Sequence, residues 1–322
     1  MKIVALLPTF RTSTCGKAVG GGELSNHFLL HYLSMEGHQI SVLSLSTAAS
    51  VADMEDGLSV FEPCGLRQAR FLNLFYKRIR YKKSAERLVA EIQPDVILST
   101  TEFSGLAISI GEASDIPVGI FVRAYENFRS VHLLSREVTS GLKKLIKEFL
   151  YGRYGPEKLR RSDLLITNSK FMLNFCAARI PEVPSVVVYP PVASSYNRQA
   201  HFEFPIIVSM VGTRPEKGSS IIRELAVFFP DWEFRIIGLQ DNQVKPANKS
   251  SNLKLLGWVD TTKEFSYVSD VVLVPSLWSE PFGRVAIEAL SAGKIPIVSN
   301  QGGLPEAVGF EEVLIVKETS TE

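Results

Sequence analysis

Two glutamates, Glu280 and Glu288, stand eight positions apart in the segment 278–306. Pro281 suits the first position of a helix, and Gly283 lets a ligand approach the backbone. The largely apolar run 285–290 then predicts a helix that starts near Pro281, with free backbone N–H groups that would face an anion. At helical rise the carboxylates would lie about 12 Å apart, against about 5 to 9.5 Å for glycoside hydrolysis across one bond. We therefore expect them to bind two parts of one long, phosphate-bearing ligand.

A sugar nucleotide has this layout, because a sugar, a diphosphate and a ribose follow one another. The segment resembles the signature of retaining glycosyltransferases of the GT-B fold, the large family four group, in which seven residues separate two glutamates. The resemblance implies that Glu280 contacts sugar hydroxyls and that Glu288 holds the ribose. It also implies that the backbone of Phe282, Gly283 and Arg284 approaches the sugar and the phosphates. The alternative is an ordinary buried helix with solvated glutamates, which the Pro-Phe-Gly between the two glutamates disfavours.

A second loop, 211–218, places two cations between glycines after a β-branched run. The resemblance implies that Lys217 and Arg214 bind the donor phosphates, and positive charge here would stabilise the departing diphosphate. Together with Glu280 they are the expected catalytic residues. A solvated turn is the alternative: the match at Lys217, directly before Gly218, disfavours it, whereas for Arg214 both interpretations stay open.

Near the N-terminus Gly20, Gly21 and Gly22 precede a helical pattern, and such a loop can hold phosphate or an acceptor at the helix start. The dinucleotide-binding fingerprint is absent, because Ser25 stands where its last glycine would be. The family places a glycine-rich loop followed by a glutamate here, so the resemblance assigns Gly21 and Gly22 to the donor site. A purely structural turn is an equally open interpretation.

Many family members have a histidine after the fourth strand of the first domain, but this sequence has none between Phe121 and Glu126. We expect Arg123 or Glu126 to take the acceptor-side role instead. His27 and His31 have a spacing that can bind metal, yet the accompanying glutamate and a third ligand are missing. With no paired-carboxylate motif either, we expect neither a cofactor nor a metal ion.

Short β-branched runs alternate with helical patterns, which predicts βαβ units and parallel sheets. A helix-poor stretch up to residue 201 interrupts the alternation. We therefore predict an α/β protein with two Rossmann-like doubly wound domains facing a cleft (the GT-B fold): residues 1–195 on the acceptor side and residues 196–322 for the nucleotide sugar. Relatives continue through further helices, so the second domain is expected to lack its last ones. The predicted strands are 2–7, 40–45, 96–99, 118–122, 164–167, 186–189, 206–211, 233–237, 270–274, 295–298 and 313–316.

Composition limits the protein class further. The 322 residues carry a net charge of +1, divided into +5 for residues 1–195 (23 basic against 18 acidic) and −4 for residues 196–322 (12 against 16). The cysteines, Cys15, Cys64 and Cys176, are odd in number and far apart, which disfavours a disulfide framework and a zinc site. No apolar run reaches the length of a membrane span, and the first apolar run is too short for a signal peptide. We expect a cytoplasmic protein.

Residues 67–87 contain eight basic side chains and one acidic one, interleaved with aromatic and aliphatic residues. A basic amphipathic helix of this kind favours an anionic membrane surface, so a peripheral position on the cytoplasmic face is the favoured hypothesis. A solvated helix face is the alternative. No recognised nucleic-acid module accompanies the charge, so nucleic acid is not an expected partner.

These observations predict a retaining, hexosyl-type glycosyltransferase of the EC 2.4 class. It would move a sugar from a nucleotide sugar to a hydroxyl on a glycan or lipid-linked cell-envelope precursor, in polysaccharide or lipopolysaccharide biosynthesis. No general base is evident; in the mechanism usually drawn for the family, a departing phosphate oxygen receives the acceptor proton. A non-catalytic GT-B subunit that binds a nucleotide or glycan, and a nucleotide-sugar epimerase, are the alternatives.

Overall fold

The computed structural model describes residues 1–10, 21–45, 57–61, 73–125, 128, 156–192, 204–238, 252–257, 265 and 268–317. The chain forms two compact units. The first comprises Met1–Asn168 and Met172–Pro191, and the second comprises Ser169–Phe171 and Val192–Glu322. The predicted boundary at residues 195 and 196 falls outside the described residues.

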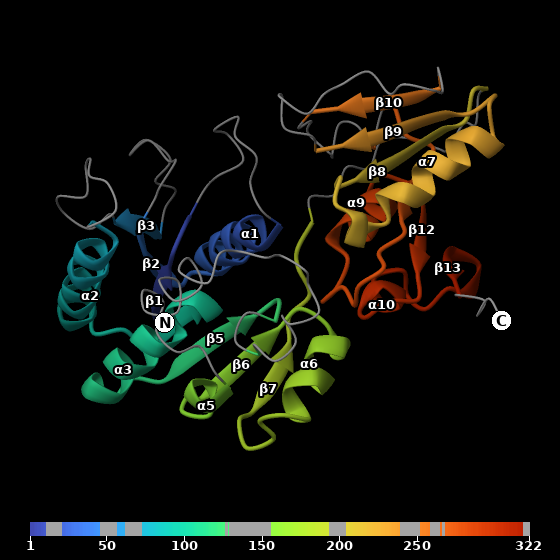
Figure 1. The fold of residues 1–322 in the computed structure, drawn as a ribbon. Coiled ribbons are helices and arrows are strands. Elements are labelled where there is room, and N and C mark those ends of the chain that lie inside the picture. The colour runs from blue at the N-terminus through green and yellow to red at the C-terminus, as the bar shows by residue number, and fades with distance from the viewer. Residues whose placement is uncertain are drawn as a thin grey trace. The chain divides into compact units, whose positions relative to one another are not determined.

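The first unit contains a parallel sheet with the strand order β3-β2-β1-β4-β5-β6-β7 (Figure 1). Its central strands are continuous apolar runs, as expected for strands covered on both faces. β1, for example, is buried from Ile3 to Leu7. The strands are β1 (Lys2–Leu7), β2 (Gln39–Ser44), β3 (Leu58–Phe61), β4 (Val96–Thr100), β5 (Val118–Val122), β6 (Leu164–Thr167) and β7 (Ser185–Val187). The helices are α1 (Gly21–Met35), α2 (Asn73–Ile92), α3 (Ser104–Ser114), α5 (Pro156–Leu159) and α6 (Lys170–Ala177), which belongs to this unit from Met172 on, with the 3-10 turn η2 (Thr101–Phe103).

The second unit repeats this plan with the parallel strand order β10-β9-β8-β11-β12-β13. Its strands are β8 (Ile207–Val211), β9 (Glu233–Ile237), β10 (Leu253–Leu256), β11 (Val271–Val274), β12 (Ile295–Ser299) and β13 (Ile315–Val316). Its helices are α7 (Ser219–Phe228), α9 (Arg284–Ser291) and α10 (Leu304–Ala307), with the 3-10 turns η4 (Pro215–Lys217) and η6 (Glu312–Leu314). Loops that leave the carboxyl ends of β8 and β11, which are neighbours in the sheet, can therefore meet at one edge.

All of the predicted strands are found, with shifted ends at several. β1, β5, β6 and β9 have the predicted bounds, whereas the last predicted strand is shorter in the structure (β13) because Glu312–Leu314 form a 3-10 turn. The prediction missed β3 and β10. Both lie at the outer edges of their sheets, and β10 has the sequence LKLL, which lacks the β-branched residues that signal a strand.

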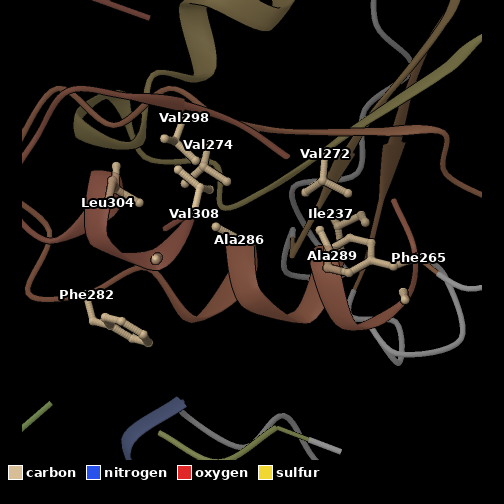
Figure 2. Packing of buried hydrophobic residues seen from close by; sticks show 12 residues of the cluster. Ile237, Phe265, Val272, Val274, Phe282, Ala286, Ala289, Val298, Leu304 and Val308 are labelled. Atoms are coloured by element: carbon tan, nitrogen blue, oxygen red, sulfur yellow. The ribbon is translucent and has the colours of Figure 1, made fainter. Parts of the chain in front are cut away.

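The core of the second unit holds α9 against the sheet. Ala286 and Ala289 are fully buried and lie three residues apart, on one face of the helix. Figure 2 shows them among the side chains of the cluster that includes Val272 and Val274 of β11. Because alanine side chains are short, the helix backbone comes close to the strands, and the segment before the helix is held beside the carboxyl end of β11.

Tyr81 joins α2 to the edge of the first sheet. Its ring is fully buried and stacks against Phe103, with 4.5 Å between ring centroids. Its hydroxyl lies 2.8 Å from the carbonyl of Leu43 and 3.2 Å from that of Leu7, at the ends of β2 and β1. Burial raises the pKa of Tyr81 well above its usual value, and the bond to Leu7 opposes this only partly. The phenol therefore stays neutral and donates to this edge.

Replacing Tyr81 by phenylalanine should lower the free energy of unfolding by about 1 to 3 kcal/mol, because buried carbonyls lose their donor. Urea unfolding followed by circular dichroism measures this. Trp232, Trp258 and Trp278 all belong to the second half of the chain, so their fluorescence would not report on the first unit. Tyr32→Phe, at an exposed position on α1, is the control and should leave the free energy of unfolding nearly unchanged. Equal losses in both variants would contradict the proposed role of Tyr81.

Candidate functional site

The Glu280 carboxylate is the centre of a hydrogen-bonded cluster in the second unit. Its Oε1 atom lies 2.5 Å from Nζ of Lys217, 2.6 Å from the Ser276 hydroxyl and 3.1 Å from Nε1 of Trp278. The Glu280 side chain is only 9% exposed, whereas that of Lys217 is 27% exposed. The carboxylate is thus largely buried, whereas the Lys217 ammonium beside it can still be reached by solvent or by a ligand.

Lys217 is carried by the turn that follows β8. The 3-10 turn Pro215–Lys217 places its side chain toward the next loop, and the backbone N–H of Leu277 donates to the carbonyl of Glu216 (2.9 Å). This bond joins the turn after β8 to the loop after β11. The Lys217 ammonium also lies 5.3 Å from the centroid of the Trp278 ring, within cation–π range. The structure therefore brings together two of the three predicted catalytic residues, Lys217 and Glu280.

The third, Arg214, lies on the surface of the same turn. Its side chain is 65% exposed and pairs with Glu216 at 3.2 Å. Its backbone carbonyl accepts a hydrogen bond from the Lys217 N–H (3.0 Å), but the side-chain contacts of the described residues do not join its guanidinium to Glu280. A catalytic role for Arg214 stays a prediction.

The backbone of Glu280 is fixed by the turn at residues 302–303. Glu280 and Gly302 form a parallel β-bridge, and the N–H of Gly303 donates to the Glu280 carbonyl (2.7 Å). Gly302 has φ +62°, and a Cβ built on it would lie 2.2 Å from the Glu280 carbonyl oxygen. Only glycine fits this close approach, so the turn has a structural role in holding Glu280.

The prediction that the helix starts near Pro281 is wrong. α9 begins at Arg284, because residues 281–282 form a bend and Gly283 adopts φ +113°, outside the right-handed helical region. A Cβ at Gly283 would lie 2.5 Å from Cδ2 of Leu304, so the backbone packs tightly there as well. Glu280 and Glu288 therefore do not lie on one helix, and the separation of about 12 Å expected from helical rise no longer applies.

Glu288 lies on the second turn of α9 and is paired with Arg284 one turn earlier. Nε of Arg284 lies 2.6 Å from Oε1 of Glu288, and the two side chains are 13% and 15% exposed. The Phe282 side chain is buried in the core shown in Figure 2, which leaves its backbone for any ligand contact. The predicted donor-binding residues of this segment thus surround the N-terminus of α9, where N–H groups lack intrahelical partners.

In the first unit, Arg123 follows β5 and reaches the first turn of α1. Its guanidinium donates to the Gly22 carbonyl (3.0 Å) and to the Asn26 side chain, and it lies over the Phe121 ring at 4.6 Å. Gly21 begins α1, and nothing lies within 4 Å of a Cβ built on Gly22. Two predicted site elements, the glycine loop and Arg123, therefore meet within this unit. Gly20 and Glu126 lie outside the described residues.

Residues that the sequence analysis missed complete both clusters. Ser276 and Trp278 bind the Glu280 carboxylate, and the Asn26 side chain accepts from Arg123. Asn168 follows β6, and its amide donates to the Arg123 carbonyl (3.2 Å). A usable signal did exist, because Ser276 and Asn168 each come just after a predicted strand, where side chains collect at the carboxyl edge of a parallel sheet.

Among the described residues, no three His, Cys, Asp or Glu side chains are grouped so that they could hold a metal ion. The rings of His27 and His31 stack, with centroids 6.1 Å apart and an interplanar angle of 5°. In the same described part of the chain, no helix is both long enough and apolar enough to span a membrane.

The chain is similar to known proteins in both sequence and structure. Residues 19–196 match the family model described as Glycosyltransferase Family 4, and residues 197–322 match the one described as Glycosyl transferases group 1. The chain is 21% identical over 312 residues to an uncharacterized 42.6 kDa protein in the cps region of Klebsiella pneumoniae, a match that covers 89% of this chain and 83% of that protein. It is 27% identical over 180 residues to a phosphatidyl-myo-inositol mannosyltransferase of Mycolicibacterium smegmatis, covering 52% of this chain and 44% of that protein.

Anabaena Alr3699/HepE, whose crystal structure contains UDP and glucose, aligns with a TM-score of 0.63 and 19% identity over 95% of this chain and 82% of that chain. The two parallel sheets with interleaved helices and this neighbour establish an α/β two-domain GT-B fold. Since the family models together span residues 19–322, the chain belongs to the family 4, group 1 glycosyltransferases, which are transferases of the EC 2.4 class.

Proposed function

We propose that this chain transfers a hexosyl group from a nucleotide sugar to an acceptor hydroxyl with retention of anomeric configuration. The observation that carries the proposal is the pair of Lys217 and Glu280 at the carboxyl edge of the second sheet. A carboxylate that is ordered and largely buried can accept hydrogen bonds from sugar hydroxyls. A partly exposed ammonium beside it can bind the diphosphate at the same time.

Lys217 is the proposed electrostatic catalyst. Departure of the diphosphate develops negative charge, and an ammonium held in advance stabilises that charge without reorganisation. An ammonium has three donors, so Lys217 can contact a phosphate while it keeps its bond to Glu280. The N-terminus of α9 offers further N–H groups for the same anion. We propose that this charge replaces a metal ion.

The donor is proposed to be a sugar nucleotide whose ribose meets Glu288. HepE, which shares the fold, has been solved with UDP and glucose, so UDP is the first nucleotide to test. For the acceptor, similarity to a phosphatidyl-myo-inositol mannosyltransferase supports a glycan or lipid-linked precursor of the cell envelope. Arg123, ordered by its bonds to Gly22 and Asn26, is the proposed acceptor-side residue.

Calorimetric titration with UDP, GDP, ADP and CMP should show selective binding of one nucleotide, weakened about 10- to 100-fold by Glu288→Ala, because a charged acceptor for the ribose is lost. Glu288→Gln distinguishes loss of the charge from loss of the side chain. The control is Glu312→Ala, at an exposed glutamate of the same unit. Failure of all four nucleotides to bind the wild type would overturn the proposed donor site and favour the non-catalytic alternative.

Turnover tests the catalytic role of Lys217. With the nucleotide sugar that binds and a sugar acceptor, Lys217→Ala should lower kcat about 100- to 1000-fold, because one donor to the leaving group is lost. EDTA should leave the wild-type rate unchanged, and NMR of the product should show the anomeric configuration of the donor. Lys254→Ala, at an exposed lysine of β10, is the control.

Other outcomes of this assay would favour different functions. Isomerised donor in the absence of any acceptor would favour an epimerase, and an unchanged kcat in Lys217→Ala would remove the proposed electrostatic role. Inverted product would overturn the retaining mechanism.

We also propose that α2 binds an anionic membrane surface by charge. In its described part, the apolar side chains of Tyr81, Ala85, Leu88 and Val89 are buried in the protein, so they are not available for insertion into lipid. The side chains of Arg80, Lys82, Lys83 and Arg87 are exposed on the same helix. An electrostatic contact of this kind weakens as salt screens it.

In liposome flotation, the wild type should float with phosphatidylserine vesicles at low salt and should no longer float with them at high salt. Lys82→Glu with Lys83→Glu should reduce recovery at low salt, because each basic residue near the surface contributes about 1 kcal/mol. Arg223→Glu with Lys317→Glu, an equal change of charge at exposed positions of the second unit, is the matched control. Equal recovery of the two double variants would exclude the surface of α2 as the membrane contact.

A further inference from the structure

The hydrogen bonds to Glu280 are unevenly divided between its two carboxylate oxygens. Lys217, Ser276 and Trp278 all donate to Oε1. A carboxylate offers about four lone-pair sites over its two oxygens, so three donors occupy Oε1 completely. Among the residues that the structure describes, none donates to Oε2. The oxygen that remains to accept a hydrogen bond from a ligand is therefore Oε2.

This asymmetry needs an explanation, because the terminal torsion of a glutamate side chain is broad and its two oxygens exchange readily. Lys217 alone does not determine which oxygen is used, since an ammonium is a compact point charge that either oxygen can meet. Two neutral donors at defined positions do determine it. One of them, Ser276, is fully buried, and the other, Trp278, carries its N–H on a rigid ring that also faces the Lys217 ammonium.

Ser276 itself is fixed on both sides. It lies two residues after the end of β11, and its carbonyl accepts a hydrogen bond from the Ser299 hydroxyl (2.6 Å) at the end of β12. Ser276 is thus connected to two neighbouring strands of the sheet, to β11 along the chain and to β12 through this hydrogen bond. A donor on such a rigid support can hold a carboxylate in one orientation.

We propose that Ser276 is a positioning residue of the donor site. Its hydroxyl, with the Trp278 indole, orients the Glu280 carboxylate so that Oε2 accepts a hydrogen bond from a hydroxyl of the sugar. This inference rests on the proposed function, in which Glu280 contacts the donor sugar. Removal of the Ser276 hydroxyl leaves the charge of Glu280 and the pair with Lys217 in place. It lets the carboxylate rotate, which weakens recognition of the sugar but not of the diphosphate.

The test compares a nucleotide sugar with its parent nucleoside diphosphate. UDP-glucose with UDP, GDP-mannose with GDP, and ADP-glucose with ADP are titrated into the wild type, and the pair that binds is used for the variants. Ser276→Ala should weaken binding of the nucleotide sugar about tenfold and should change the affinity for the nucleoside diphosphate by less than about twofold. Trp278→Phe, which keeps a ring and removes the N–H, should show the same selectivity.

A matched control separates this effect from general loss of a buried hydroxyl. Ser209→Ala removes an equally buried hydroxyl of the same unit, one that pairs with Ser269 in the sheet, and it should change neither affinity. Thermal unfolding of each variant shows whether it folds. Should Ser276→Ala fail to fold, Trp278→Phe at its partly exposed position decides the outcome.

A double-mutant cycle with Glu280→Gln shows whether Ser276 acts through Glu280. The selective loss caused by Ser276→Ala should disappear in the Glu280→Gln background, since the charged carboxylate that Ser276 orients is gone. A loss that persists there, or one that is equal for the nucleotide sugar and the nucleoside diphosphate, would overturn the positioning role while leaving the proposed function intact. If no pair binds the wild type, the proposed function and this inference both fail.

Discussion

The ion pair between Lys217 and Glu280 is the interaction on which the second unit's site depends. A carboxylate removed from water is costly unless it is paired and hydrogen-bonded. Here the compensation comes from an ammonium at 2.5 Å and from two neutral donors. These groups come from the turn after β8 and from the loop after β11, so the pair forms only when β8 and β11 lie side by side in the sheet.

Three structural layers support this pair. The turn at Gly302 and Gly303 holds the Glu280 backbone, and the short side chains of Ala286 and Ala289 bring α9 close to the strands. The strands themselves place the carboxyl-edge loops next to one another. The first unit has a polar cluster of its own, in which a backbone carbonyl and an asparagine side chain accept hydrogen bonds from Arg123.

Sequence reasoning succeeded where the signal was local. Runs such as Val118–Val122 and Leu164–Thr167 are strands because β-branched and aliphatic side chains fill positions buried on both faces of a sheet. It failed at Pro281, because Glu280 before it forms a β-bridge with the distant Gly302 and residues 281–282 form a bend, which delays the start of the helix to Arg284. The edge strand β10 was missed because its LKLL sequence has little intrinsic strand preference and depends on pairing with β9.

The amino-acid sequence by itself determined the class of fold and the family, because strand and helix periodicities and the spacing of Glu280 and Glu288 are properties of neighbouring residues. It also indicated that Lys217 belongs to the site. Only the tertiary structure decided that Lys217 meets Glu280, that Ser276 and Trp278 orient the carboxylate, and that Arg123 reaches the first turn of α1. The physical reason is that these contacts join residues separated by up to about a hundred positions. Their closeness depends on strand order and register, and neither is encoded in the spacing of residues along one segment.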